Sequence, residues 1–144
     1  MSNATPAVQA FFDQYARSRS ALNIDHIASQ YPDVCMFAGP AGARVGEKAA
    51  VLAAFPKGQA FLKAAGHKST TVLSLDETRL DEHYGLVRAA FAWRFERPPA
   101  QPIDVTINST FILHMNPAGP RIVFQLEHQE FQEALKASGV LPAA

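Results

Sequence analysis

Residues 103–131, IDVTINSTFILHMNPAGPRIVFQLEHQEF, predict a long antiparallel β-hairpin. Two apolar-rich strands, Ile103–Met115 and Arg121–Phe131, flank a turn of sequence NPAG at residues 116–119. The proline of this turn presets φ and its glycine accepts the left-handed region, so the residue types suit a tight connection. A loop of four residues collects the apolar side chains on one face, whereas a register shifted by one residue would mix the two faces. We therefore expect the four-residue loop.

This register predicts which side chains of the hairpin face inward. The inward face is expected to carry Ile107, Ser109, Phe111, Leu113, Ile122, Phe124, Leu126 and His128. The outward face is expected to carry Asn108, Thr110, Ile112, His114, Val123, Gln125, Glu127 and Gln129. Ser109 and His128 are then polar groups among inward hydrophobes. A curved sheet with a few inward polar groups is how a small domain builds a ligand pocket.

Composition and charge narrow the class of protein. At 144 residues, 48% hydrophobic and 18% charged, the chain has the composition of one soluble globular domain. We expect that domain to span residues 1–144, with its core at about 6–131. Thirteen basic and 13 acidic residues cancel, which argues against nucleic acid or an anionic membrane as a partner.

Cysteine content and hydropathy indicate the subcellular localisation. Cys35 is the single cysteine, which excludes an internal disulfide framework and fits a reducing compartment. No apolar run reaches the roughly 20 residues that span a bilayer. The first residues do not show the basic-then-apolar pattern of a signal peptide. These observations predict a cytoplasmic protein.

Helices are expected in the first half of the chain. Thr5-Pro6 predicts a helix start, with the threonine hydroxyl as N-cap and proline at the first helical position. Asn23 is expected to cap a second, shorter helix that ends at Pro32. A third helix is predicted from Glu47 to Phe55. Pro56 and Gly58 are expected to break it before a further short helical stretch, Gln59–Ala65.

Strands dominate the second half. A short strand is predicted at Val34–Ala38, and a longer one at Ser69–Arg79, where Leu73 and Leu75 alternate with polar residues. The next strand, Leu86–Arg97, places one set of side chains on a single face: Val87, Ala89, Phe91, Trp93 and Phe95. Helices grouped before a meandering antiparallel sheet predict an α+β domain.

This order of elements resembles the nuclear-transport-factor-2-like superfamily, which includes SnoaL-like polyketide cyclases and ketosteroid isomerases. The resemblance covers roughly residues 6–131 and rests on Gln14-Tyr15, residues 23–27, residues 37–40 and 45–47, residues 89–93 and the turn at 116–119. It implies a cone-shaped, strongly curved antiparallel sheet wrapped around the N-terminal helices, as in the cystatin-like fold. It also implies a hydrophobic pocket open at one end and a homodimer formed through the outer sheet face.

The resemblance to the isomerases extends to one of three functional residues. Their first-helix tyrosine, which donates a hydrogen bond to a developing oxyanion, matches Tyr15. Their general base matches Gly39, and their second oxyanion donor matches Phe111. Because glycine and phenylalanine cannot transfer protons, steroid isomerase chemistry is not expected.

The candidate site combines polar groups with aromatic walls. Tyr15 and His128 are the candidate catalytic residues, since histidine titrates near neutrality and a buried tyrosine needs a partner for its hydroxyl. The structural alternatives are a histidine bonded to its neighbours and a tyrosine packed in the helix stripe. The candidate ligand-binding residues are Phe12, Tyr15, Cys35, Phe37, Phe91, Trp93, Ser109, Phe111 and His128. The histidines show no metal-binding spacing and no nucleotide-binding glycine pattern is present, so neither a metal nor another cofactor is expected.

Two functions follow as hypotheses. The first is a small-molecule-binding domain, an isomerase-, cyclase- or hydrolase-type enzyme acting on a hydrophobic or aromatic ligand. The alternative is a non-catalytic dimeric binding or interaction module. A homodimer is expected in either case, because the predicted outer face mixes apolar and polar residues: Thr110, Ile112, Val123 and Gln125. Arg94 and Glu96 are expected to form an outward ion pair rather than a catalytic pair.

Overall fold

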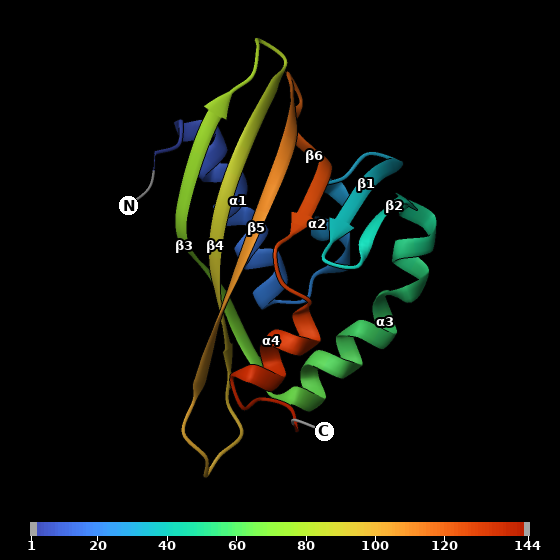
Figure 1. Cartoon of the computed structure of the whole chain (residues 1–144). Coiled ribbons are helices and arrows are strands. Elements are labelled where there is room, and N and C mark those ends of the chain that lie inside the picture. The colour runs from blue at the N-terminus through green and yellow to red at the C-terminus, as the bar shows by residue number, and fades with distance from the viewer. Residues whose placement is uncertain (1–2, 143–144) are drawn as a thin grey trace.

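The computed structural model describes residues 3–142 and confirms the α+β class (Figure 1). In chain order the elements are α1 (Pro6–Ser20), α2 (Ile24–Ser29), β1 (Val34–Gly39), β2 (Gly42–Glu47), α3 (Lys48–Ala65), β3 (His67–Arg79), β4 (Tyr84–Phe95), β5 (Ile103–Asn116), β6 (Gly119–Glu127) and α4 (Phe131–Ala137). The strands form one sheet in the order β2-β1-β6-β5-β4-β3. All neighbours are antiparallel except β1 and β6, which run parallel.

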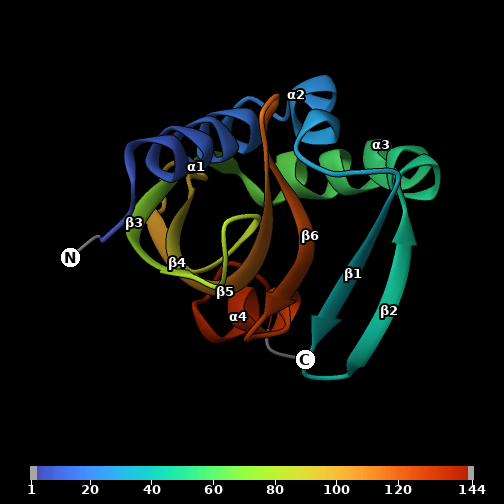
Figure 2. The same cartoon turned by 90° about the horizontal axis from the view of Figure 1, so that it is seen from above.

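The sheet curves around α1, which lies across its concave side (Figure 2). Phe12 on α1 is fully buried, and its ring centroid lies 5.0 Å from that of Phe111 on β5 and 6.3 Å from that of Phe91 on β4. A second group of buried side chains, including Phe95, Val105 and Leu135, packs where α4 meets β4 and β5. None of the helices in residues 3–142 is both long and apolar enough to cross a membrane.

The hairpin between β5 and β6 has the predicted loop but not the predicted faces. Met115 pairs with Pro120, which confirms the four-residue turn. Leu113 then pairs with Ile122, but Ile112 pairs with Phe124, so Val123 is an extra residue that forms a β-bulge. Because strand side chains alternate with a period of two, one extra residue exchanges the inward and outward sets from this point onward.

The bulge overturns half of the predicted face assignment of β6. Ile122, before the bulge, is buried beside Leu113 as predicted. Beyond the bulge, Gln125 and Glu127 point to the concave side, since they pair with Phe111 and Ser109. Phe124, Leu126 and His128 therefore point to the convex side, and their predicted inward orientation is wrong.

A tertiary contact marks the position of the bulge. The backbone N–H of Ile122 donates to the carbonyl oxygen of Gln30, at a distance of 2.8 Å, where the chain leaves α2. Immediately beyond the bulge, Phe124 pairs with Met36 on the parallel strand β1. The bulge thus separates the part of β6 that contacts the α2 loop from the part that pairs with β1.

The start of α1 and the middle of α3 differ from prediction. The Thr5 hydroxyl does not cap α1; it donates to Oε1 of Glu77 at 3.0 Å, so a partner on β3 replaces the local cap. Pro56 lies inside α3, which continues to Ala65 as one helix. A proline removes one intrahelical hydrogen bond and bends a helix, and here the turns on both sides remain helical.

Two elements were not predicted from the sequence. The strand β2 pairs with β1 across the turn that joins Gly39 to Gly42, and its side chains are almost all exposed, so it lacks the alternation that signals a strand. The helix α4 begins at Phe131, where the predicted last strand was expected to end. The Asn23 cap of α2, in contrast, is confirmed: its side chain accepts a hydrogen bond from the N–H of His26.

A second bulge, at Leu73 on β3, provides a test of the packing. Val72 pairs with Phe91 and Ser74 with Ala90, which leaves Leu73 unpaired and 51% exposed, whereas Leu75 is fully buried. The two leucines were expected to share one face, and the bulge separates them. We predict that Leu75→Ala lowers the free energy of unfolding by about 2–5 kcal/mol, through lost burial and the cavity left behind.

The matched variant Leu73→Ala is expected to change that free energy by no more than about 0.5 kcal/mol. Urea unfolding followed by circular dichroism measures both variants. Equal losses for the two leucines would contradict the arrangement of β3 described above.

Candidate functional site

A pocket of about 460 Å³ opens between the concave face of the sheet and the helices α1, α3 and α4. Most of its wall is apolar and includes Phe61 and Leu62 on α3, Phe91 and Trp93 on β4, and Phe131 on α4. The polar lining residues come from α1, β5 and β6 (Tyr15, Arg19, Ser109, Gln125 and Glu127) and from α3 and α4 (Gln59 and Gln132). Pockets for small organic molecules commonly combine these features, with an apolar lining and a few convergent polar groups.

Helix α1 supplies a stacked pair to the polar side. Tyr15 and Arg19 are four residues apart, so they lie one above the other on the same face of the helix. The guanidinium carbon of Arg19 lies 3.4 Å from the centroid of the Tyr15 ring, which is a cation–π contact. Both residues are buried. The stack brings a positive charge to the polar side of the pocket.

A chain of hydrogen bonds runs from Arg19 to Glu127 and crosses three parts of the fold. Arg19 Nη2 donates to the hydroxyl of Tyr31 at 2.9 Å, and that hydroxyl donates to Oε1 of Gln125 at 2.6 Å. Gln125 Nε2 donates to Oε1 of Glu127 at 2.6 Å, and the Ser109 hydroxyl donates to Oε2 at 2.7 Å. We call Arg19, Tyr31, Gln125, Glu127 and Ser109 the polar chain. From Arg19 to Glu127 each residue donates a hydrogen bond to the next, and Ser109 donates a further one to Glu127.

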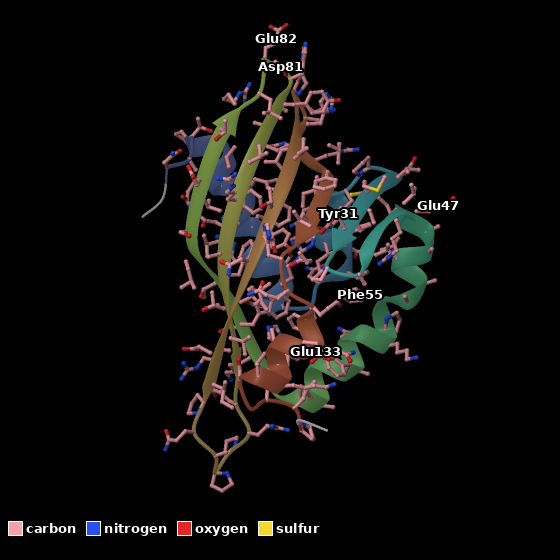
Figure 3. All side chains as sticks on the ribbon, in the orientation of Figure 1. Tyr31, Glu47, Phe55, Asp81, Glu82 and Glu133 are labelled. Carbon is pink, nitrogen blue, oxygen red and sulfur yellow. The ribbon has the colours of Figure 1, made fainter. Side chains whose placement is uncertain are left out.

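Figure 3 shows Tyr31 beside β1 and β6, whereas Asp81 and Glu82 lie at the far tip of the β3–β4 hairpin. The position of Tyr31 follows from its two contacts. Its ring centroid is 5.9 Å from that of Phe37 on β1, and its hydroxyl bonds Gln125 on β6. The same figure labels Phe55 on α3, which contributes to the apolar wall of the pocket.

Burial keeps the two tyrosines of the site protonated. It raises the pKa of Tyr15 far above its ordinary value, and the positive charge of Arg19 offsets only part of this effect. Burial also raises the pKa of Tyr31, again against the opposing influence of Arg19. At neutral pH both hydroxyls therefore remain hydrogen-bond donors and do not act as bases.

The predicted ligand-binding residues divide into three groups. Tyr15, Phe91, Trp93 and Ser109 line the pocket. Phe12 and Phe111 are fully buried in the core and do not line it. The remaining residues, Cys35, Phe37 and His128, lie elsewhere.

Cys35 and Phe37 border a separate void of about 20 Å³ next to α2 and α3. Phe37 also borders an open groove of about 460 Å³ along the β1–β2 turn, which shares Gln125, Glu127 and Phe131 with the main pocket. Burial raises the pKa of the Cys35 thiol to about 11, so almost none of it is thiolate at neutral pH.

The expectation that His128 faces the pocket is wrong. His128 is exposed on the convex side of the sheet, and its Nε2 lies 2.7 Å from the hydroxyl oxygen of Thr110. The bulge at Val123 accounts for this position, because it reverses the faces of β6. The sheet separates His128 from the pocket, so the residue cannot reach a ligand held there.

Five polar residues of the pocket were missed in the sequence: Arg19, Gln59, Gln125, Glu127 and Gln132. Arg19 could have been found, since it follows Tyr15 by one helical turn. Gln125 and Glu127 could not, because their inward orientation depends on the bulge. Within residues 3–142 no group of three or more His, Cys, Asp and Glu side chains is placed to hold a metal ion. The expected ion pair between Arg94 and Glu96 is confirmed, with a distance of 2.7 Å between Nε and Oε2.

Comparison with known proteins identifies the family of the fold. A family model described as NTF2-like protein (DUF6841) matches residues 4–130. No curated protein matches the sequence.

Several solved structures share the fold at low sequence identity. An NTF2-like protein with a cystatin-like fold from Novosphingobium aromaticivorans superposes with a TM-score of 0.70 at 13% identity, covering 94% of this chain and 86% of that chain. The β subunit of benzoate 1,2-dioxygenase from Burkholderia mallei gives 0.71 at 14% identity, covering 92% and 95%. A ketosteroid isomerase-like protein from Erwinia carotovora atroseptica gives 0.61 at 12% identity, covering 85% and 92%.

The polar chain predicts a large effect of one hydroxyl group. Tyr31→Phe removes the oxygen that accepts from Arg19 and donates to Gln125, and leaves both partners without it. We expect the free energy of unfolding to fall by about 1–3 kcal/mol.

The matched control is Tyr84→Phe, because Tyr84 is 38% exposed and water can replace any partner of its hydroxyl. Its effect should stay within about 0.5 kcal/mol. Urea denaturation of both variants beside the unmodified protein measures the difference. A Tyr31→Phe variant as stable as the control would show that the polar chain contributes no stability.

Proposed function

The chain belongs to the NTF2-like family, and from this premise we propose that it is a small-molecule-binding domain whose pocket takes a hydrophobic or aromatic ligand. The observation that carries this proposal is the lining of the pocket, which combines aromatic and aliphatic side chains with four members of the polar chain: Arg19, Ser109, Gln125 and Glu127. Its volume of about 460 Å³ lies within the range of about 300–1,000 Å³ typical of small-molecule sites.

An enzymatic role in this pocket would keep Tyr15 of the predicted catalytic pair and replace His128 by Glu127. Glu127 is the carboxylate that lines it, and both of its oxygens accept a hydrogen bond from a neighbour. Tyr15, which stays protonated, would orient a ligand oxygen, and Glu127 would exchange a proton with the ligand. This pairing supports an isomerase-, cyclase- or hydrolase-type reaction as the catalytic form of the proposal. One solved structure of similar fold is named a ketosteroid isomerase-like protein.

Two residues of the pocket allow ligand binding to be tested: Trp93, whose fluorescence can report binding, and Gly58, where a larger side chain can occupy the cavity. Trp93 is the single tryptophan of the chain and lines the pocket, so its fluorescence should change when a ligand enters. Gly58 on α3 also lines the pocket, and a Cβ atom built on it would meet no other atom within 4 Å. A larger side chain at this position can therefore occupy the cavity without a clash at its base.

We predict that an uncharged apolar probe, 1-adamantanemethanol, binds saturably and changes Trp93 fluorescence. Gly58→Phe should weaken that binding by roughly tenfold or more, because the ring occupies space the probe needs. Gly58→Ala, the matched control, should leave affinity within about threefold. Linear, non-saturating titrations with the unmodified protein would contradict the proposal, as would equal affinities for the two variants.

The alternative function is a dimeric binding or interaction module, and the convex face of the sheet favours a homodimer. Strand pairing aligns five apolar residues in one row across β2, β1, β6, β5 and β4: Val45, Met36, Phe124, Ile112 and Leu86. We call this set the convex row. Val45 is 60% exposed and Met36 37% exposed, while the other three are half-buried. A contiguous apolar patch on a sheet face is typical of a protein interface.

The composition of this face differs from the expected one along β6 beyond the bulge. Ile112 faces outward as predicted, but Gln125 points into the pocket, and Phe124 takes its place on the convex side. The exchange makes the face more apolar than the sequence indicated. A second copy of the chain related by a two-fold axis would pair the convex row with itself.

We predict that the protein is a dimer at micromolar concentration and that Ile112→Arg makes it a monomer, since the variant places like charges in an apolar contact. Thr106→Arg, on the same convex face but outside the convex row, is the matched control and should remain dimeric. Gel filtration with light scattering measures the mass. A monomeric unmodified protein would refute the homodimer.

A further inference from the structure

We propose that the pocket selects ligands carrying a carboxylate, or a comparable oxyanion, on a compact apolar body, and that Arg19 is its anion-binding residue. The inference rests on the proposed small-molecule function and adds the chemical class of the ligand. It starts from the surroundings of one buried cation.

Arg19 is only 8% exposed, yet its hydrogen-bond partners are uncharged. It donates to the Ser18 hydroxyl at 3.2 Å, to the side-chain oxygen of Gln30 and to the Tyr31 hydroxyl. Among the ion pairs within residues 3–142, none involves Arg19. Burying a charge costs free energy unless an opposite charge lies close to it. Arg19 has no such charge in direct contact, and a bound anion could supply one.

The carboxylate of the polar chain does not neutralise Arg19 directly. Two side chains, Tyr31 and Gln125, stand between the guanidinium and Glu127 along the hydrogen bonds. Both side chains are uncharged, so they connect Arg19 to Glu127 by hydrogen bonds without forming an ion pair. An anion in direct contact with Arg19 would therefore have to be supplied by a bound ligand.

Arg19 lies where a ligand could reach it and retains donors to offer. It lines the pocket together with Tyr15, over whose ring it is stacked. A guanidinium has five N–H donors in a planar fork suited to carboxylates, and its bonds to Ser18, Gln30 and Tyr31 do not use all of them. The protonated Tyr15 hydroxyl adds a donor on the same side.

The opposite end of the polar chain sets the orientation of such a ligand. Glu127 also lines the pocket, and its negative charge repels an anion placed next to it. The carboxylate should therefore lie toward Arg19, with the apolar body against Phe91, Trp93 and Leu62. Removing the charge of Glu127 should then strengthen anion binding, whereas removing that of Arg19 should weaken it.

The test compares two probes that differ only in the charged group: adamantane-1-carboxylate and 1-adamantanemethanol. Both are transparent where Trp93 absorbs, so its fluorescence reports both titrations at pH 7.5. The unmodified protein should bind the carboxylate roughly tenfold or more tightly than the alcohol, because a hydrogen bond to a charged group is the stronger one. In Arg19→Met this preference should disappear, so that the affinities for the two probes differ by less than about threefold.

Three further variants keep the test decisive if Arg19→Met folds poorly. Glu127→Gln should raise the ratio of the affinity for the carboxylate to that for the alcohol severalfold. Arg19→Lys should retain part of the preference, since it keeps the charge but not the fork. Arg17→Met, which removes an exposed arginine of the same helix outside this pocket, should behave like the unmodified protein.

The outcomes separate this inference from the proposed function. If the unmodified protein binds both probes equally, or prefers the alcohol, the anion selectivity is refuted and the small-molecule function stands. If the preference survives in Arg19→Met, another residue binds the anion and the assignment to Arg19 is wrong. If the unmodified protein binds neither probe, both the inference and the proposed function fail.

Discussion

One extra residue in β6, Val123, determines how the two faces of the sheet are used. Strand side chains alternate strictly, so the bulge at Val123 exchanges inward and outward positions for the rest of the strand. It turns Gln125 and Glu127 into the pocket and sends Phe124 and Leu126 to the convex side. Both proposed functions depend on this exchange, because the first uses the polar side chains and the second uses the apolar ones. A regular β6 would have offered neither arrangement.

The buried Arg19 is the second element that links structure to function. Its guanidinium is stacked on Tyr15 and hydrogen-bonded to the segment after α2, and through Tyr31 and Gln125 it connects α1 to β6. Buried polar groups cost stability unless their partners are in place, so the polar chain has to form together with the packing around it. It therefore holds α1, the α2 loop and β6 in one relative position. The same requirement aligns the cation and the carboxylate on one side of the pocket.

The pocket is not lined by the two positions that the resemblance to ketosteroid isomerases matched to a general base and a second oxyanion donor. The positions that match their base and second oxyanion donor are Gly39, at the end of β1, and Phe111, which is fully buried in the core. The pocket instead has Glu127 on β6 and a cation on α1, a different distribution of charge on a shared scaffold. A fold shared at 12–14% identity with proteins of different names leaves the chemistry to the side chains of the site.

The sequence by itself determined the class of the fold, the four-residue turn, the Asn23 cap and the apolar face of β4, because each depends on neighbouring residues and on local periodicity. Only the tertiary structure decided the faces of β6, the exposure of His128, the continuity of α3 through Pro56 and the pairing of β2. These features arise from contacts between segments distant in the sequence, such as Ile122 with Gln30 and Phe124 with Met36. A bulge leaves no periodic signal of its own, and a single inserted residue reverses every later side chain. For that reason the sequence indicated a pocket, but the charged groups that line it could be found only in the folded chain.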